Sequence, residues 1–149
     1  MNTNVKTPVA VPDIAQPIQT SVDDETLLSI SEMADRFQVT LRTLRFYEEK
    51  GLLSPVRRGS RRFYREQEIG RMRVILQAKR IGLTLVEIRQ VLKLAVGKTQ
   101  RAEQLRKLRE ICSQQEEMLR DQYEQVRLQL AETEQVLGQL EELMKSEAA

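Results

Sequence analysis

The sequence contains no histidine and only one cysteine, Cys112, among its 149 residues. A single cysteine excludes an intramolecular disulfide, and without histidine it excludes a tetrahedral zinc site of Cys and His ligands within one chain. The lack of histidine also removes the commonest general base and every Ser-His or Cys-His nucleophile pair. We therefore expect no enzyme, no catalytic residue, no metal and no cofactor.

Long apolar runs are also missing. No stretch approaches the length of a transmembrane helix, and the first residues lack the apolar core of a signal peptide. We expect a cytoplasmic protein with no membrane partner. Aromatic residues make up 4% of the chain and charged residues 31%, a composition that indicates an extended, mainly helical protein.

Prolines are few and gathered near the N-terminus, where Pro8, Pro12 and Pro17 account for three of the four. Neither a helical nor a strand period survives around them. The sequence therefore predicts a disordered N-terminal tail over residues 1–26.

Charge is distributed unevenly, although the net charge is only +2. Residues 36–80 contain 13 basic and 4 acidic side chains, whereas residues 99–149 contain 7 basic and 11 acidic ones. The first of these segments therefore favours a polyanionic partner, and the second does not.

The basic segment opens with a short predicted helix that begins at Thr40, a good N-cap, and ends at Gly51. Arg42 and Arg45 lie three residues apart, so that both guanidinium groups share one helical face. A shorter amphipathic helix precedes it, from about Ser31. Two such helices joined by a tight turn form a helix-turn-helix, whose second helix enters the major groove of DNA.

A cluster of arginines follows this second helix. They surround a turn at Gly59-Ser60, between the apolar pairs Leu52-Leu53 and Phe63-Tyr64, which predicts a two-stranded hairpin, or wing. The arginines are Arg57, Arg58, Arg61, Arg62 and Arg65.

Two further helices are expected after the wing. The first runs from about Glu66 to Ile81, and the second starts at a capping box formed by Thr84 and Glu87 and ends at Gly97. Together with the preceding elements they predict a DNA-binding domain over residues 27–97.

The last third of the chain has no proline and one glycine, and its apolar residues alternate at spacings of four and three. About 46 residues of helix would span roughly 70 Å, and four short helices cannot bury so long an apolar seam. We expect a homodimer formed through a coiled coil over residues 98–146. The predicted interface consists of Leu105, Leu108, Cys112, Leu119, Tyr123, Val126, Leu130, Leu137 and Leu140.

Four segments of the sequence resemble motifs of the MerR family of bacterial transcription regulators. They are Ile30–Ala34 in the first helix, Thr43–Pro55 in the second helix and its exit, Arg62-Phe63-Tyr64 in the wing, and Lys79–Ile88 between the third and fourth helices. The resemblance is to a short form, without the family's metal-binding loop or C-terminal drug-binding domain.

This resemblance implies a mainly α fold, in which a winged helix-turn-helix domain with a small β-hairpin wing precedes a long antiparallel coiled-coil dimerisation helix. It also implies a dimer that binds double-stranded promoter DNA, distorts it and so acts indirectly on RNA polymerase. The expected DNA contacts, from the residue pattern and the family motif together, are Thr40, Arg42, Thr43, Arg45, Tyr47, Arg57, Arg58, Arg61, Arg62 and Tyr64.

Several alternatives remain open at this point. The protein could be an architectural or excisionase-like DNA-bending protein without an effector, or a coiled-coil adaptor whose basic half binds an acidic protein. Tyr47 and Tyr64 could be core residues with satisfied hydroxyls. Cys112 fits a small apolar filler better than a redox or metal ligand. Any effector is expected to be a small organic molecule between the DNA-binding domain and the partner's long helix.

Overall fold

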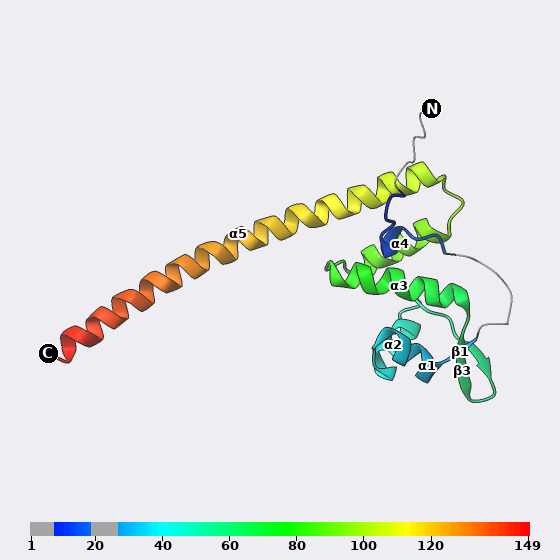
Figure 1. Ribbon diagram of the computed structural model, residues 1–149, viewed down its shortest axis with the longest axis horizontal. Coiled ribbons are helices and arrows are strands. Elements are labelled where there is room, and N and C mark those ends of the chain that lie inside the picture. The colour runs from blue at the N-terminus through cyan, green and yellow to red at the C-terminus, as the bar shows by residue number, and fades with distance from the viewer. Residues whose placement is uncertain (1–7, 19–26) are drawn as a thin grey trace, which may run out of the picture. The chain divides into compact units, whose positions relative to one another are not determined.

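The computed structural model of the protein describes residues 8–18 and 27–149 (Figure 1). The chain divides into two compact units, one ending at Leu108 and the other running from Arg109 to Ala149. The fold is mainly helical, with one small antiparallel sheet and a long C-terminal helix. The predicted fold class is therefore confirmed. The first unit reaches beyond the predicted domain boundary at residue 97, because Gln104 and Leu108 are buried within it.

Helix α1 (Ile30–Phe37) begins at a capping box that involves the preceding residue, Ser29. The Glu32 backbone N–H donates to Ser29 Oγ at 3.2 Å, and the Glu32 carboxylate accepts from the Ser29 N–H at 3.3 Å. A left-handed residue, Gln38 (φ 52°), then turns the chain toward the next helix. The result is a short helix with Met33 and Ala34 buried.

Helix α2 (Leu41–Glu49) starts and ends where its capping residues predict. Thr40 Oγ1 accepts the Thr43 N–H at 3.1 Å. At the other end Gly51 adopts φ +73°, and the N–H groups of Gly51 and Leu52 donate to carbonyls in the last turn of the helix. This pattern is a Schellman motif, which favours glycine because a side chain strains the left-handed backbone.

A three-stranded sheet follows, in the order β1-β3-β2, with β1 at Leu28–Ser29, β2 at Val56–Arg58 and β3 at Arg61–Tyr64. The predicted hairpin is formed by β2 and β3 around Gly59, whose φ is +63°. Strand β1 adds to the far side of β3. The sequence does not predict β1, because two residues are too few to show strand alternation.

Helices α3 (Glu66–Arg80) and α4 (Leu85–Val96) complete the core of the first unit. The predicted capping box of α4 is present, with Thr84 Oγ1 accepting the Glu87 N–H at 3.2 Å. The largest fully buried side chains come from α1, α2, the following loop, β3, α3 and α4. They are Met33, Leu44, Leu52, Tyr64, Met72, Val74, Ile75 and Val91.

The N-terminal residues 8–18 pack against α3 through a 3-10 turn, η1 (Asp13–Ala15), drawn in dark blue in Figure 1. Ile14 and Ile18 are buried, the Ile14 N–H donates to Gln77 Oε1, and Ile18 lies beside Gly70. The prediction of disorder is therefore wrong for residues 8–18, because the isolated apolar side chains between the prolines pack against α3. The rest of the predicted tail, residues 1–7 and 19–26, lies outside the described residues.

Helix α5 (Arg101–Glu147) is one continuous helix that leaves the first unit and forms nearly all of the second. Its extent confirms the predicted long helix. Within the described parts of the chain, no helix is long and apolar enough to cross a membrane.

Candidate nucleic-acid interface

The outer face of α2 presents Arg42 and Arg45, both exposed, while Leu44 and Tyr47 are buried on the inner face. The inner residues hold the helix against the core, so the two guanidinium groups are displayed from a rigid element. At the N-terminus of the helix, Thr40 Oγ1 and Thr43 Oγ1 lie 2.9 Å apart, and Thr40 is exposed. This face can therefore offer charged and hydroxyl groups to the edge of a nucleic-acid groove.

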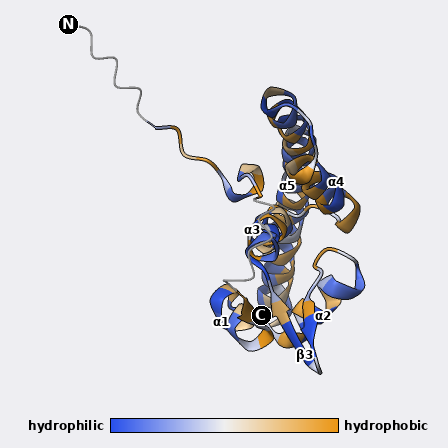
Figure 2. Cartoon of the chain, turned by 90° about the vertical axis from the view of Figure 1, so that its right-hand side faces the viewer, coloured by the Kyte–Doolittle hydropathy of each residue, from blue (hydrophilic) through white to orange (hydrophobic). Residues whose placement is uncertain are grey.

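The wing concentrates positive charge, and this concentration would destabilise a hairpin in isolation. Its register places Arg57 opposite Arg62 and Arg58 opposite Arg61, so each face of the hairpin carries a cross-strand arginine pair. Like charges directly opposite one another destabilise a strand pair. Figure 2 shows part of β3 in the blue of hydrophilic residues. The exposed Arg57 and Arg61 can offer their charge to a polyanion.

Glu48 connects α2 to the wing. The Tyr64 hydroxyl donates to Glu48 Oε1, and Arg62 Nε lies 3.2 Å from Glu48 Oε2. Tyr64 is fully buried, and its burial, followed by the hydrogen bond to Glu48, raises the pKa of its phenol. Two of the predicted DNA contacts, Arg62 and Tyr64, are therefore used inside the protein, where they fix the wing relative to α2.

Tyr47 is also buried, with 2% of its surface exposed, and its hydroxyl has no hydrogen-bond partner among the residues that the structure describes. Its ring lies 5.8 Å from that of Phe46, centroid to centroid. The core alternative is thus correct for the ring, but the hydroxyl is not satisfied as that alternative requires. DNA contact by Tyr47 stays a prediction.

A second set of contacts fixes the chain where it leaves α2. Arg71 Nε donates to the Leu52 carbonyl at 2.9 Å, and an Arg89 N–H donates to the Lys50 carbonyl at 2.7 Å. The Ser54 N–H donates to Glu68 Oε2 at 3.1 Å. Because the residues in these pairs are 14 to 39 positions apart, no local sequence pattern predicts the contacts.

Glu68 is the buried acid of this set. Burial raises the pKa of its carboxyl, which the Ser54 N–H and the nearby Arg71 only partly offset. Arg71 Nε lies 3.8 Å from Glu68 Oε2. Together with the Glu48 contacts, these interactions hold the recognition helix, its exit loop and the wing as one surface.

No group of three or more His, Cys, Asp or Glu residues able to hold a metal ion occurs in the described part of the chain. Cys112 is a free thiol, half-buried, and its burial raises the pKa of the thiol. It therefore has the character of an unreactive apolar residue at neutral pH.

The predicted dimer seam lies on α5. Leu108 is already buried within the first unit, so little of its surface is left for a partner chain. The other large apolar members, from Leu105 onward, are exposed to between 43% and 72%. These exposed members are Leu105, Leu119, Tyr123, Val126, Leu130, Leu137 and Leu140.

Comparison with known families finds two matches that together span most of the described chain. The model described as the MerR HTH family regulatory protein matches residues 28–95. The model described as MerR, DNA binding, matches residues 69–143, which is half of the chain. Both matches begin after residues 8–18, so the N-terminal segment on α3 lies outside them.

The individual proteins that the chain resembles are regulators as well. The chain is 30% identical over 83 residues to the HTH-type transcriptional regulator ZntR homolog of Haemophilus influenzae, covering 54% of this chain and 62% of that protein. It is 39% identical over 72 residues to the mercuric resistance operon regulatory protein of Pseudomonas fluorescens, covering 47% and 50%. The chain thus spans between half and two thirds of these relatives. All of them are regulators and none is an enzyme.

Among solved structures, a MerR-family transcriptional regulator from Bacillus cereus superposes with a TM-score of 0.54 at 27% identity, covering 69% of this chain and 75% of that one. On the family matches, the relatives and the fold together, this chain belongs to the MerR family of helix-turn-helix regulatory proteins.

Proposed function

We propose that this protein is a dimeric, sequence-specific transcription regulator that binds promoter DNA through α2 and the wing. The proposal rests on one observation. Glu48 of α2 contacts Arg62 and Tyr64 of the wing, so that the helix and the wing are joined. A recognition helix and a wing fixed to each other can meet a major groove and a neighbouring backbone in one register.

Within this surface the contacts divide by exposure. Arg42 and Arg45 project from α2 toward base edges, where an arginine can bind guanine in a bidentate manner. Thr40 and Thr43 sit at the start of the same helix. The exposed wing arginines, Arg57, Arg58 and Arg61, neutralise phosphates, and Arg62 and Tyr64 position the wing that carries them.

The exposed apolar seam of α5 supports the dimer. Within the described residues, the large apolar side chains of α5 between residues 119 and 144 are exposed along this helix of 47 residues. A second copy covers the seam by knobs-into-holes packing, antiparallel as in the family. Two DNA-binding domains would then meet two half-sites, and linking them multiplies the affinity of each.

Such a dimer would distort the promoter and thereby alter its use by RNA polymerase in the cytoplasm, in response to a small organic effector. Deformation of this kind depends on the sequence between the contacted half-sites. The proposed partners are thus promoter DNA, a second copy of the chain and, through the promoter, RNA polymerase.

The test begins with selection of genomic fragments bound by the full chain, followed by binding and transcription assays on the fragment recovered. Specific binding that weakens steeply with salt, with protection of two half-sites, is the expected result. Transcription from that fragment should change when the protein is added. Bending of DNA without any change in transcription would instead support the architectural protein, and salt-insensitive binding without sequence preference would support neither.

A further inference from the structure

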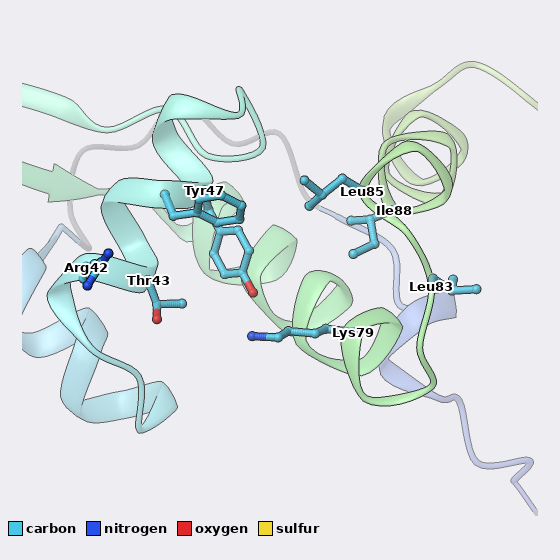
Figure 3. Close-up of a pocket in the computed structure, with 8 residues that line it drawn as sticks. Arg42, Thr43, Tyr47, Lys79, Leu83, Leu85 and Ile88 are labelled. Carbon is cyan, nitrogen blue, oxygen red and sulfur yellow. The ribbon is translucent and has the colours of Figure 1, made fainter.

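A pocket lies between α2, the C-terminal end of α3 and the start of α4. Its volume is about 410 Å³, within the range of small-molecule sites. Figure 3 shows Leu85 and Ile88 of α4 facing the aromatic rings of α2 across this space. One wall is therefore apolar and partly aromatic, and it belongs wholly to the first unit.

Polar groups also line this cavity. The hydroxyl of Tyr47 and the amino group of Lys79 are directed into the same space (Figure 3), one from α2 and the other from α3. Thr43 adds a second hydroxyl from α2. Polar groups from two helices thus line a cavity that also has apolar and aromatic side chains, which is the usual composition of a binding site for an organic molecule.

The Tyr47 hydroxyl is the most informative of these groups. The residue is 2% exposed, and its oxygen is buried with no hydrogen-bond partner among the described residues. Leaving a buried hydroxyl unpaired is costly, and native proteins rarely do so. A phenylalanine at position 47 would fill the same space without an unpaired buried hydroxyl. The presence of the hydroxyl therefore points to a hydrogen-bond partner supplied by another molecule.

The charge of the pocket selects the kind of partner. Lys79 is exposed and forms no ion pair with any residue that the structure describes, and no carboxylate lines the cavity. Lys79 and the Tyr47 hydroxyl are both able to donate to an anionic group, and such charge-assisted hydrogen bonds are the strong ones.

We propose that this pocket binds a small organic anion, with its carboxylate held by Lys79 and the Tyr47 hydroxyl and its apolar or aromatic body against Phe46, Leu85 and Ile88. Phe46 is 40% exposed and offers a ring face for that body. The site lies within a single DNA-binding domain, so it is complete without the partner's long helix.

The same pocket adjoins the predicted DNA-reading surface, because Arg42 also lines it. A carboxylate in the pocket attracts the Arg42 guanidinium, which is then less available to DNA. Anion and DNA therefore oppose each other's binding by the same factor. This coupling rests on the proposed function, whereas binding of the anion does not.

The experiment uses the full chain without DNA and 3-phenylpropionate as the probe, followed by calorimetry and by the methyl resonances of Leu85 and Ile88. The expected dissociation constant is at or below about 1 mM. Lys79→Met should weaken binding about tenfold, and Tyr47→Phe about fivefold. Arg73→Met, which removes an exposed cation of α3 that does not line the pocket, should leave binding within twofold.

Two further ligands separate the components of the proposal. The uncharged analogue 3-phenylpropanol should bind at least tenfold more weakly than the acid. Equal binding of the two would overturn the proposal that the pocket selects an anion. Acetate and inorganic phosphate should bind at least tenfold more weakly as well. If either ion binds as tightly as the probe, the cavity binds anions in general, and the proposal that it also binds an apolar body is wrong. Absence of probe binding, or no effect of Lys79→Met, overturns the site whether or not the chain binds DNA.

Discussion

Arg62 Nε lies 3.2 Å from Glu48 Oε2, a contact that joins the wing to the helix predicted to read DNA. The second oxygen of the same carboxylate accepts the hydroxyl of the buried Tyr64. One acid on α2 therefore holds two residues of β3. It explains why two residues of the family's wing motif are turned inward, and it makes the geometry of the proposed interface depend on one acidic side chain.

Replacing this acid should loosen the wing. Glu48→Gln removes the charge that faces Arg62 and weakens the acceptor for Tyr64, so the free energy of unfolding should fall by about 1–2 kcal/mol. Urea denaturation of the full chain measures the change. Glu49→Gln, at the next and exposed position, is the matched control and should change stability by less than about 0.5 kcal/mol. Equal effects of the two variants would show that the Glu48 contacts do not stabilise the domain.

Arg45 should contribute to sequence discrimination as well as to affinity. Arg45→Ala is expected to weaken binding to the selected DNA by about 1–3 kcal/mol and to non-specific DNA by less, because a bidentate contact to guanine is lost. Fluorescence anisotropy with both DNAs at one salt concentration measures this. Arg73→Ala removes a cation from α3 and should not change the ratio. If Arg45→Ala weakens both DNAs equally, the residue binds phosphate.

The sequence predicts the helices of this fold well because their ends have local chemical causes. Thr40, Thr84 and Gly51 each cap a helix through bonds to residues a few positions away, so the spacing alone identifies them. The capping box of Ser29 and Glu32 has the same form and could have been predicted. Strand β1 could not, because two residues pair with β3 only once the domain is folded.

The candidate site is predicted less completely, since burial depends on residues far apart in the chain. Motif position indicates that Tyr47, Arg62 and Tyr64 belong to the DNA-binding surface, yet the structure directs Tyr64 to Glu48 and the Tyr47 hydroxyl into a cavity. The docking of residues 8–18 is likewise non-local, because the Ile14 N–H donates to Gln77, 63 positions away, and Ile18 lies beside Gly70. Composition indicates disorder there, and packing overrides it.

The buried acid Glu68 should make the domain's stability depend on pH. Burial raises the pKa of its carboxyl in the folded protein, so the folded state holds this proton more tightly than the unfolded state. Its contribution is thus present below about pH 4.5 and is lost as the pH rises through the raised pKa. Glu68→Gln, which keeps an acceptor for the Ser54 N–H, should therefore gain stability relative to the original chain between about pH 4.5 and 7. Urea denaturation at several pH values would contradict this if the relative stability moved the opposite way.

Cys112 should be dispensable. Burial raises the pKa of its thiol, which keeps the group protonated and slow to react at neutral pH. Cys112→Ser should leave binding to the selected DNA and any response to an effector within a few-fold, and alkylation of the original thiol by iodoacetamide should be slower than that of free cysteine. Loss of the response in Cys112→Ser, with the dimer intact, would make a redox or metal role the better explanation.

The proposed dimer can be tested by two leucines that differ chiefly in the face of α5 they occupy. Leu130 is 56% exposed and lies on the seam, whereas Leu128 is 55% exposed and points to the opposite side of the helix. Both are substituted by aspartate, so that helix propensity and charge change equally. Leu130→Asp places a charge in the middle of the proposed coiled coil and should shift the chain from dimer to monomer at micromolar concentration. Leu128→Asp should leave the dimer intact.

Sedimentation velocity measures the two variants, and far-ultraviolet circular dichroism shows whether the helix persists. Binding to the selected DNA should weaken at least tenfold in Leu130→Asp, because the two half-site contacts are no longer linked, while Leu128→Asp should bind as the original chain does. A dimer that survives Leu130→Asp, or that is lost equally in both variants, would place the interface elsewhere than the seam running from Leu119 to Leu140.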